Sequence, residues 1–186
     1  MYKRIEGIFA NLGKRADRRP ARGLAILMGL VFIAFFLISL RFTGPAYLSD
    51  EIGYLTKAIA ISGDPVSFPT KWYGGYSFFL APVFIVLGSP KVEWYGIMAI
   101  NALLWSLSAG LLYSLLRNLF KNRRPSTVLL VVALSMMYPS WLIVSGYALA
   151  TSAFVPILLL ALLALLKSQL RDTLWLTIFA VTGGLS

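Results

Sequence analysis

Two acidic residues stand side by side at Asp50 and Glu51, in a chain with only seven acidic residues among 186. The chain has no histidine and no cysteine, which excludes a histidine base, a Ser–His or Cys–His nucleophile pair and a cysteine metal site. Catalysis would therefore have to use carboxylates, Lys, Tyr or groups on the substrate itself. A carboxylate could take the proton of an acceptor hydroxyl. The structural alternative is that Asp50 only caps its helix and Glu51 is exposed to solvent.

This pair lies in the longest polar interval of the chain, residues 41–72, where we expect a short helix. Ser49 is a suitable N-cap, and both acids fall in the first turn, where the helix dipole favours negative charge. Gly63 is a typical helix stop. Three apolar residues recur at helical spacing, at Ile52, Leu55 and Ile59. The pattern predicts an amphipathic helix that lies along a membrane surface.

Long uncharged runs dominate the rest of the chain. Hydrophobic residues make up 59% of the sequence and charged residues only 13%, whereas about a quarter of the residues of a soluble domain are charged. The first run, 24–40, approaches the roughly 20 residues that a helix needs to cross a bilayer, and it lacks the A-x-A-like cleavage site of a signal peptide. Similar runs occupy 94–116, 127–148, 152–166 and 173–186. We therefore predict an all-α fold, a polytopic transmembrane helical bundle with an amphipathic juxtamembrane helix in its first outside loop.

Basic residues lie beside the ends of these runs. Seven of them precede the first run, within residues 1–22, and a second cluster from Arg117 to Arg124 follows a later run. This is the positive-inside pattern, so we expect residues 1–22 to form a basic cytoplasmic tail. Because the basic residues gather at the ends of spans, the net charge of +10 indicates no nucleic-acid partner.

Residues 73–87 decide the predicted topology, because this apolar segment is short and contains Pro82. If it crossed the membrane, the cluster from Arg117 to Arg124 would lie outside, against the charge rule. If it re-enters or lies tilted in the interface, that cluster lies inside, and Tyr138 to Tyr147 reach the outer face. We favour the re-entrant version over the crossing one. The last run stops at Ser186 without a cap or a basic flank, which predicts a chain truncated at its C-terminus.

The order of short motifs resembles a known family. The first loop reads Ser49-Asp50-Glu51-Ile52-Gly53-Tyr54, then Ser62-Gly63-Asp64, then Phe68-Pro69-Thr70-Lys71-Trp72-Tyr73-Gly74-Gly75-Tyr76. Across residues 20–185 this order is similar to that of membrane glycosyltransferases of the GT-C type, notably the protein O-mannosyltransferase and aminoarabinose-transferase group. Those enzymes use sugars carried on a polyprenyl phosphate. The resemblance implies that residues 23–186 form a GT-C-like transmembrane module with 41–72 as its outer catalytic loop.

The resemblance also implies roles for single residues. Asp50 matches the family's catalytic base, and Glu51 would assist it by position or by hydrogen bonding. Lys71 matches a lysine that contacts the lipid-linked phosphate, although beside Trp72 and Tyr73 it could equally be a lysine of the membrane belt. Four aromatic residues are candidates for substrate binding, the last three of which could instead be belt anchors: Tyr54, Trp72, Tyr73 and Tyr76.

Two positions depart from the family. Gly53 stands where some relatives carry an arginine, three residues after the catalytic acid, and Thr151 stands where many carry a second acid. A neutral residue at 151 leaves a metal-assisted mechanism without support. We therefore expect no metal and no cofactor, with the lipid-linked sugar acting as substrate.

Together these features predict a glycosyltransferase that moves a sugar from a polyprenyl-phosphate donor to an acceptor hydroxyl. The enzyme would be a multi-pass protein acting on the outer face of the cytoplasmic membrane, with a cytoplasmic N-terminus, and inactive alone if the chain is a fragment. Its expected partners are membrane lipid, the donor and an unidentified acceptor. Two alternatives stay open, a non-catalytic membrane scaffold or truncated relative, and a transporter. The long runs carry no acid or base in their interiors, which disfavours the transporter.

Overall fold

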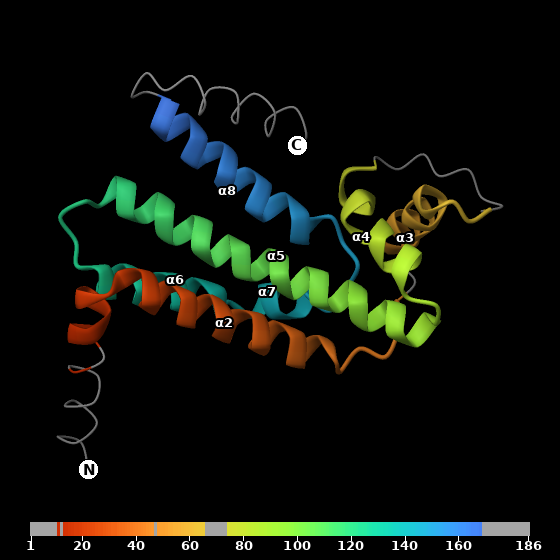
Figure 1. The fold of residues 1–186 in the computed structure, drawn as a ribbon, viewed down its shortest axis with the longest axis horizontal. Helices are drawn as coiled ribbons and strands as arrows, with labels where there is room; N and C mark the ends of the chain where they lie inside the picture. Colours follow the sequence, from red (N-terminus) through yellow and green to blue (C-terminus); the bar gives the residue numbers. More distant parts are fainter. Residues whose placement is uncertain (1–10, 12, 47, 66–73, 169–186) are drawn as a thin grey trace, which may run out of the picture.

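The computed structural model describes residues 11, 13–46, 48–65 and 74–168, and within these ranges the chain is helical without strands. The helices in chain order are α2 (Pro20–Ser39), α3 (Ser49–Ser62), α4 (Gly75–Val86), α5 (Pro90–Leu119), α6 (Pro125–Met136), α7 (Pro139–Val144) and α8 (Thr151–Ser168). Figure 1 shows α2, α5, α6 and α8 along one long axis and α3 with α4 at one end of it. The prediction of an all-α fold is confirmed.

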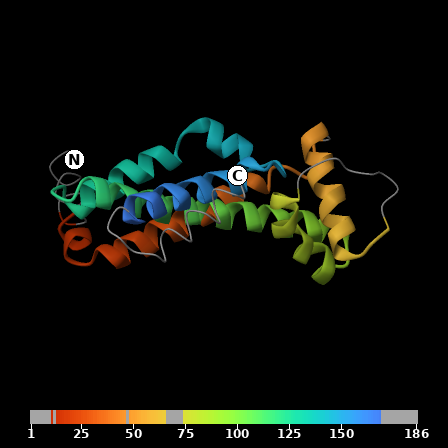
Figure 2. The ribbon, with the colours of Figure 1, turned by 90° about the horizontal axis from the view of Figure 1, so that it is seen from above.

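Helix α5 is the centre of the bundle and contacts α2, α6 and α8 along its length and α4 near its start. Figures 1 and 2 show α2 and α5 side by side and running in opposite directions. The rings of Phe35 in α2 and Trp105 in α5 stack at a centroid distance of 5.5 Å, and the ring of Trp141 in α7 lies at a centroid distance of 5.0 Å from that of Trp105. Such aromatic contacts bury large apolar areas and fix the mutual rotation of the helices.

Two helices are long and apolar enough to cross a membrane. Helix α2 has 20 residues and a mean hydropathy of 2.4, and α5 has 30 residues and a mean hydropathy of 1.6. Helix α5 contains the predicted run 94–116, and α2 contains the run 24–40 except for its last residue, the C-cap Leu40, so both runs are confirmed as helical. The apolar helices α4, α6 and α8 are shorter.

The uncharged run 127–148 is divided between two helices. Helix α6 ends at Met136, and α7 begins at Pro139 after an extended residue, Tyr138, with φ −61° and ψ 124°. Proline lacks an N–H and disfavours a helical conformation in the residue before it, which favours a break at this point. The predicted run 173–186 lies outside the described residues.

Helix α4 stays at the same end of the bundle as α3 (Figure 1). It has 12 residues, which span about 18 Å, well short of the roughly 30 Å of a bilayer core. The helix packs closely on α5, because a Cβ added at Gly96 would lie 2.8 Å from Leu87 and 3.0 Å from Val83. Residues 74–87 thus form a compact unit with α3 at the start of α5.

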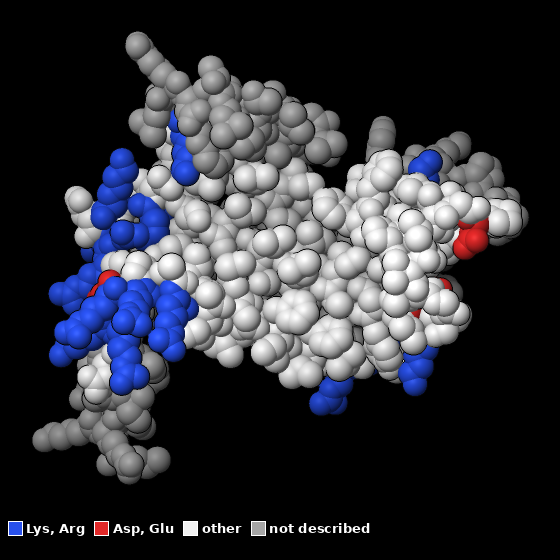
Figure 3. All heavy atoms as spheres, in the orientation of Figure 1, with Lys and Arg blue, Asp and Glu red and all other residues white. Residues whose placement is uncertain are grey.

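The opposite end of the bundle carries most of the basic side chains. Figure 3 shows Lys and Arg gathered where α2 begins and where α5 joins α6. Residues 13–18 are helical, and Arg19, with φ −137°, separates them from α2. The backbone N–H of Ser126 donates a 2.9 Å hydrogen bond to Oδ1 of Asp17, which ties this N-terminal segment to the first turn of α6. The two basic clusters of the sequence therefore lie together.

Candidate functional site

Asp50 lies in the first turn of α3 with its side chain exposed. The hydroxyl of Ser49 donates a 3.2 Å hydrogen bond to Oδ1 of Asp50. Ser49 is itself the first residue of the helix, so the predicted N-cap is shifted by one residue to Leu48, which makes no side-chain capping bond. The predicted stop is confirmed, because Gly63 has φ 100° and closes the helix in the left-handed conformation that glycine adopts most readily. Asp50 thus presents a carboxylate to the surroundings beside the positive end of the helix dipole.

Glu51 is completely buried, which corrects the alternative that it is exposed. Its Oε2 accepts a 2.7 Å hydrogen bond from the backbone N–H of Ala46, and its Oε1 accepts a 2.9 Å bond from that of Ala148. A buried carboxylate is costly unless such charge-assisted bonds compensate the lost hydration. Glu51 therefore joins the loop before α3 to the segment between α7 and α8, and both of its oxygens are occupied in doing so.

One face of α3 carries Asp50, Tyr54 and Lys57, at the i, i+4 and i+7 positions that share a side of a helix. Tyr54 is half-buried, and burial, with a smaller contribution from the charge of Asp50, raises the pKa of its phenol. The phenol thus keeps its proton at neutral pH and can donate a hydrogen bond. Lys57 extends toward Gly74, where the described chain resumes before α4. Lys57 was not predicted as a site residue, although its spacing of seven residues from Asp50 places the two on one side of a helix.

The packed face of α3 overlaps the predicted apolar face only in part. Leu55 is partly buried against the core, whereas Ile52, which was expected to share an apolar face with Leu55 and Ile59, is 44% exposed. The buried residues are Glu51, Gly53 and Ala58. The glycine that departs from the family pattern therefore lies in the packed face of α3.

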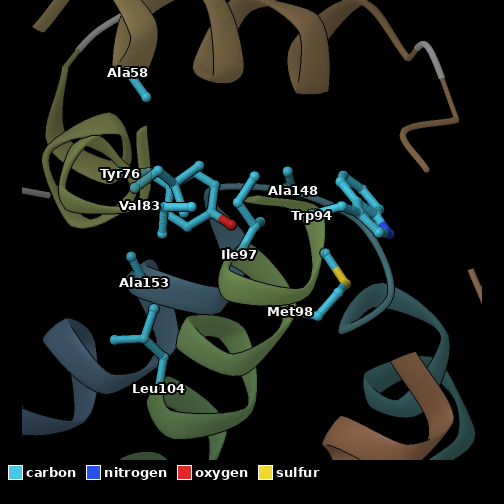
Figure 4. Close-up of a cluster of buried hydrophobic side chains, with 10 residues drawn as sticks. Ala58, Tyr76, Val83, Trp94, Ile97, Met98, Leu104, Ala148 and Ala153 are labelled. Carbon is cyan, nitrogen blue, oxygen red and sulfur yellow. The ribbon is translucent and has the colours of Figure 1, made fainter. Parts of the chain in front are cut away.

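Tyr76 is buried in the hydrophobic cluster beneath α3 (Figure 4). Its ring meets the ring of Tyr54 edge to face at 5.5 Å, and its hydroxyl donates a 2.6 Å hydrogen bond to Oδ1 of Asn101. The ring has no open face on which a sugar could stack. The structure therefore places Tyr76 as a support for Tyr54 and not at a substrate-contacting surface.

Asn101 is a buried polar residue in the middle of α5. Besides accepting from Tyr76, it donates through Nδ2 to the backbone oxygens of Tyr147, at 2.9 Å, and Ser145, at 3.3 Å. The same carbonyl of Ser145 accepts a 3.3 Å bond from the hydroxyl of Ser39, at the end of α2. Asn101 was not predicted as a structural or functional residue. Its one distinguishing feature in the sequence is a polar amide within the long apolar run 94–116.

The chain following α7 also approaches the loop after α2 very closely. Phe42 packs edge to face on Tyr147 at 5.2 Å, and its backbone oxygen accepts a 2.8 Å bond from the indole N–H of Trp94. A Cβ added at Gly146 would overlap the ring of Phe42, so this position requires glycine. Thr151, the position at which a second acid was expected from the family, begins α8.

The predicted site residues are thus only partly brought together. Asp50 and Tyr54 share a face of α3, Glu51 lies behind them in the core, and Tyr76 supports Tyr54. Lys71, Trp72 and Tyr73 lie outside the described residues. Among the residues that the structure describes, no three acidic side chains gather in one place.

Two grooves lie away from this site. One of about 600 Å³ is lined by arginines that precede or begin α2, and another of about 610 Å³ lies at the turn between α5 and α6. Both are at the basic end of the bundle, whereas the face of Asp50 is at the other end (Figure 1). Asp50 is exposed on the surface of α3.

Comparisons of the chain with protein-family models, with curated proteins and with solved structures give no match.

Proposed function

We propose that the chain belongs to a membrane glycosyltransferase that moves a sugar from a polyprenyl-phosphate donor to an acceptor hydroxyl, with Asp50 as the base. One observation carries the proposal: Asp50 is exposed while its neighbour Glu51 is buried and held by two backbone donors. Adjacent acids are thus divided between a chemical and a structural role. A catalytic group needs a rigid support of this kind, because small displacements from productive geometry are costly in rate.

The proposed membrane arrangement places the basic end of the bundle in the cytoplasm and α3 with α4 at the outer interface. The charge rule supports this orientation, because the two basic clusters lie together. Helices α2 and α5 would cross the bilayer, as would α6 with α7, and α8, while α4 would re-enter. Helix α2 has an exposed apolar stripe suited to contact with lipid, formed by Ile26, Leu30, Ile33 and Leu37.

In the proposed reaction the carboxylate of Asp50 accepts the proton of the acceptor hydroxyl as that oxygen attacks the anomeric carbon of the sugar. The bond between this carbon and the phosphate oxygen breaks, its electron pair leaves with the polyprenyl phosphate, and the configuration at carbon is inverted. Positive charge near the leaving phosphate lowers the barrier. Lys57 is suited to this role from the face that it shares with Asp50, and Lys71 keeps the phosphate-contacting role that the family resemblance implies.

A non-catalytic membrane scaffold is the second candidate, and one observation favours it. Two of the residues expected to serve catalysis, Glu51 and Tyr76, are fully used in internal contacts. In a scaffold, Glu51 and Tyr76 would serve only in packing, and Asp50 would have no chemical role.

Substitution of Asp50 distinguishes the glycosyltransferase from the scaffold. Membrane vesicles containing the protein would be supplied with radiolabelled polyprenyl-phosphate mannose or aminoarabinose, and label transferred to membrane acceptors would be counted. Asp50→Asn should reduce transfer by about 10²- to 10⁴-fold, the usual contribution of a general base. Asp64→Asn is the matched control, because it removes the same charge from an exposed position just after α3, and it should leave transfer unchanged. Undiminished transfer by Asp50→Asn would overturn the base assignment, and absence of transfer by the unsubstituted protein would favour the scaffold.

A further inference from the structure

The groove of about 600 Å³ at the basic end combines charged and apolar walls. Its charged wall consists of exposed arginines from the N-terminal segment and the start of α2: Arg15, Arg18, Arg19 and Arg22. Its apolar wall includes Ile26 of α2 and Leu129 of α6. The continuous stretch 15–26 and the distant helix α6 thus line it together.

Two contacts give this groove a defined shape. A Cβ added at Gly23 would lie 2.9 Å from Leu129 and 3.6 Å from Ala16, so the glycine allows α2 to approach both neighbouring segments. Asp17 accepts the backbone N–H of Ser126 and holds the N-terminal segment against α6. These two contacts hold the segments that carry the arginines in place against α6.

These four arginines have an excess of positive charge to offer a ligand. Among the described residues no acidic side chain forms an ion pair with them, and the nearest acid in sequence, Asp17, accepts the backbone N–H at the start of α6. The hydrogen bond from Ser126, with the charge of Arg124 adding to it, lowers the pKa of Asp17. Guanidinium groups bind phosphate oxygens strongly and often in pairs of parallel hydrogen bonds. The charged wall is thus suited to a phosphate group.

The apolar wall continues beyond the groove along α2. Ile26 is 56% exposed, and Leu30 and Ile33 follow it on the same side of the helix and are more than half exposed. This is a continuous apolar track that starts at the arginines. A free phosphate or a nucleic acid would leave it uncovered, whereas an acyl chain would cover it.

We propose that this groove binds one anionic phospholipid, with its phosphate at the arginines and an acyl chain along Ile26 and Leu129. The inference is independent of sugar transfer, because the groove and Asp50 lie at opposite ends of the bundle. Lipid bound here would link the N-terminal segment, α2 and α6 on the proposed cytoplasmic side, where anionic lipids are concentrated.

The test uses the full chain in neutral detergent with a single introduced cysteine. Ala16→Cys places a bimane fluorophore in the groove, and no other cysteine competes because the chain has none. Short-chain phosphatidylglycerol, phosphatidylcholine with the same acyl chains, and inorganic phosphate would each be titrated. Phosphatidylglycerol should give a saturable change, and the other two should bind at least about tenfold more weakly.

A charge-matched pair of variants locates the binding. Arg18→Gln with Arg22→Gln should weaken phosphatidylglycerol binding by about 30-fold, the effect of two basic residues beside an anionic lipid. Lys121→Gln with Arg123→Gln removes the same charge from the second groove at the same end, and should change affinity by less than about threefold. Equal weakening by both pairs would overturn the proposal in favour of bulk charge attraction. Equal affinity for phosphatidylcholine, equal affinity for inorganic phosphate, or no saturable binding of phosphatidylglycerol would overturn it as well.

Discussion

The backbone N–H of Ala148 donates a 2.9 Å hydrogen bond to Oε1 of Glu51, although 97 residues separate the two positions. The other oxygen of the same carboxylate holds Ala46, just before α3. One side chain therefore connects the start of the helix that bears Asp50 to the chain that leads into α8. The position of Asp50 is set by its neighbour, and this neighbour is in turn set by a distant part of the sequence.

Replacing Glu51 by alanine should lower the free energy of unfolding by about 2–4 kcal/mol, because it removes two charge-assisted bonds and leaves a buried N–H at Ala148 unpaired. Reversible denaturation by SDS in mixed micelles would measure the change. Asp64→Ala, which removes an exposed acid, should change the same quantity by less than about 0.5 kcal/mol. Equal stability of the two variants would contradict the bracing role of Glu51.

The bond between Tyr76 and Asn101 should show strong coupling in a double-mutant cycle. Tyr76→Phe alone leaves the amide oxygen of Asn101 buried without its donor, which should cost about 1–3 kcal/mol of stability. When Asn101→Leu is already present, adding Tyr76→Phe should cost less stability, by about 0.5 kcal/mol or more, since the amide oxygen that loses its donor is no longer there. Additive losses across the cycle would mean that the 2.6 Å bond contributes nothing.

Asp17 should stabilise the N-terminal segment only while it is ionised. The pKa of its carboxyl group is lowered by the hydrogen bond from Ser126, so the folded state favours the charged form. The stabilisation is therefore complete above the ordinary value of 3.8 and disappears as pH falls through the lowered value. The difference in Tm between the unsubstituted protein and Asp17→Asn should be present near neutral pH and shrink in acid. A difference that grows in acid would contradict this sign, and Asp64→Asn serves as the control for general charge effects.

Single cysteines can test which end of the bundle faces out. Asp64→Cys lies just after α3 and Asn122→Cys in the basic turn between α5 and α6, and both positions are exposed. A membrane-impermeant maleimide added to intact cells should label the first, and should label the second only after the membrane is permeabilised. Labelling of Asn122→Cys from outside would reverse the proposed orientation.

Local patterns predicted much of the fold. The runs 24–40 and 94–116 are helical, and α3 was predicted with its stop at Gly63, because apolar periodicity and a left-handed glycine act over a few residues. The separation of α6 and α7 at Pro139 is likewise a local effect, that of proline on the residue before it. The N-cap was misplaced by one residue, an error expected at helix ends.

The internal structure of the site could not be predicted in the same way. Glu51 and Asp50 are chemically similar neighbours, and only the positions of Ala46 and Ala148 decide which of them is buried. Tyr76 resembled a surface aromatic until Asn101, on another helix, supplied an acceptor for its hydroxyl. Such contacts join residues that the folded backbone brings together, and a local pattern contains no record of them.

The length of α5 sets the depth at which chemistry could occur. Its 30 residues span about 45 Å. Even when tilted by about 40°, a helix of this length is longer along the membrane normal than the roughly 30 Å of a hydrocarbon layer. In the proposed arrangement the uncharged stretch 94–116 would lie in that layer, and the turn of α5 that holds Lys91 and Glu93 would stand among the lipid headgroups. Trp94, whose indole N–H donates to the carbonyl of Phe42, would then lie at the boundary. In the proposed arrangement a donor would keep its prenyl tail among the acyl chains and raise only its phosphate and sugar to the level of α3, so immersion depth would help to select the substrate.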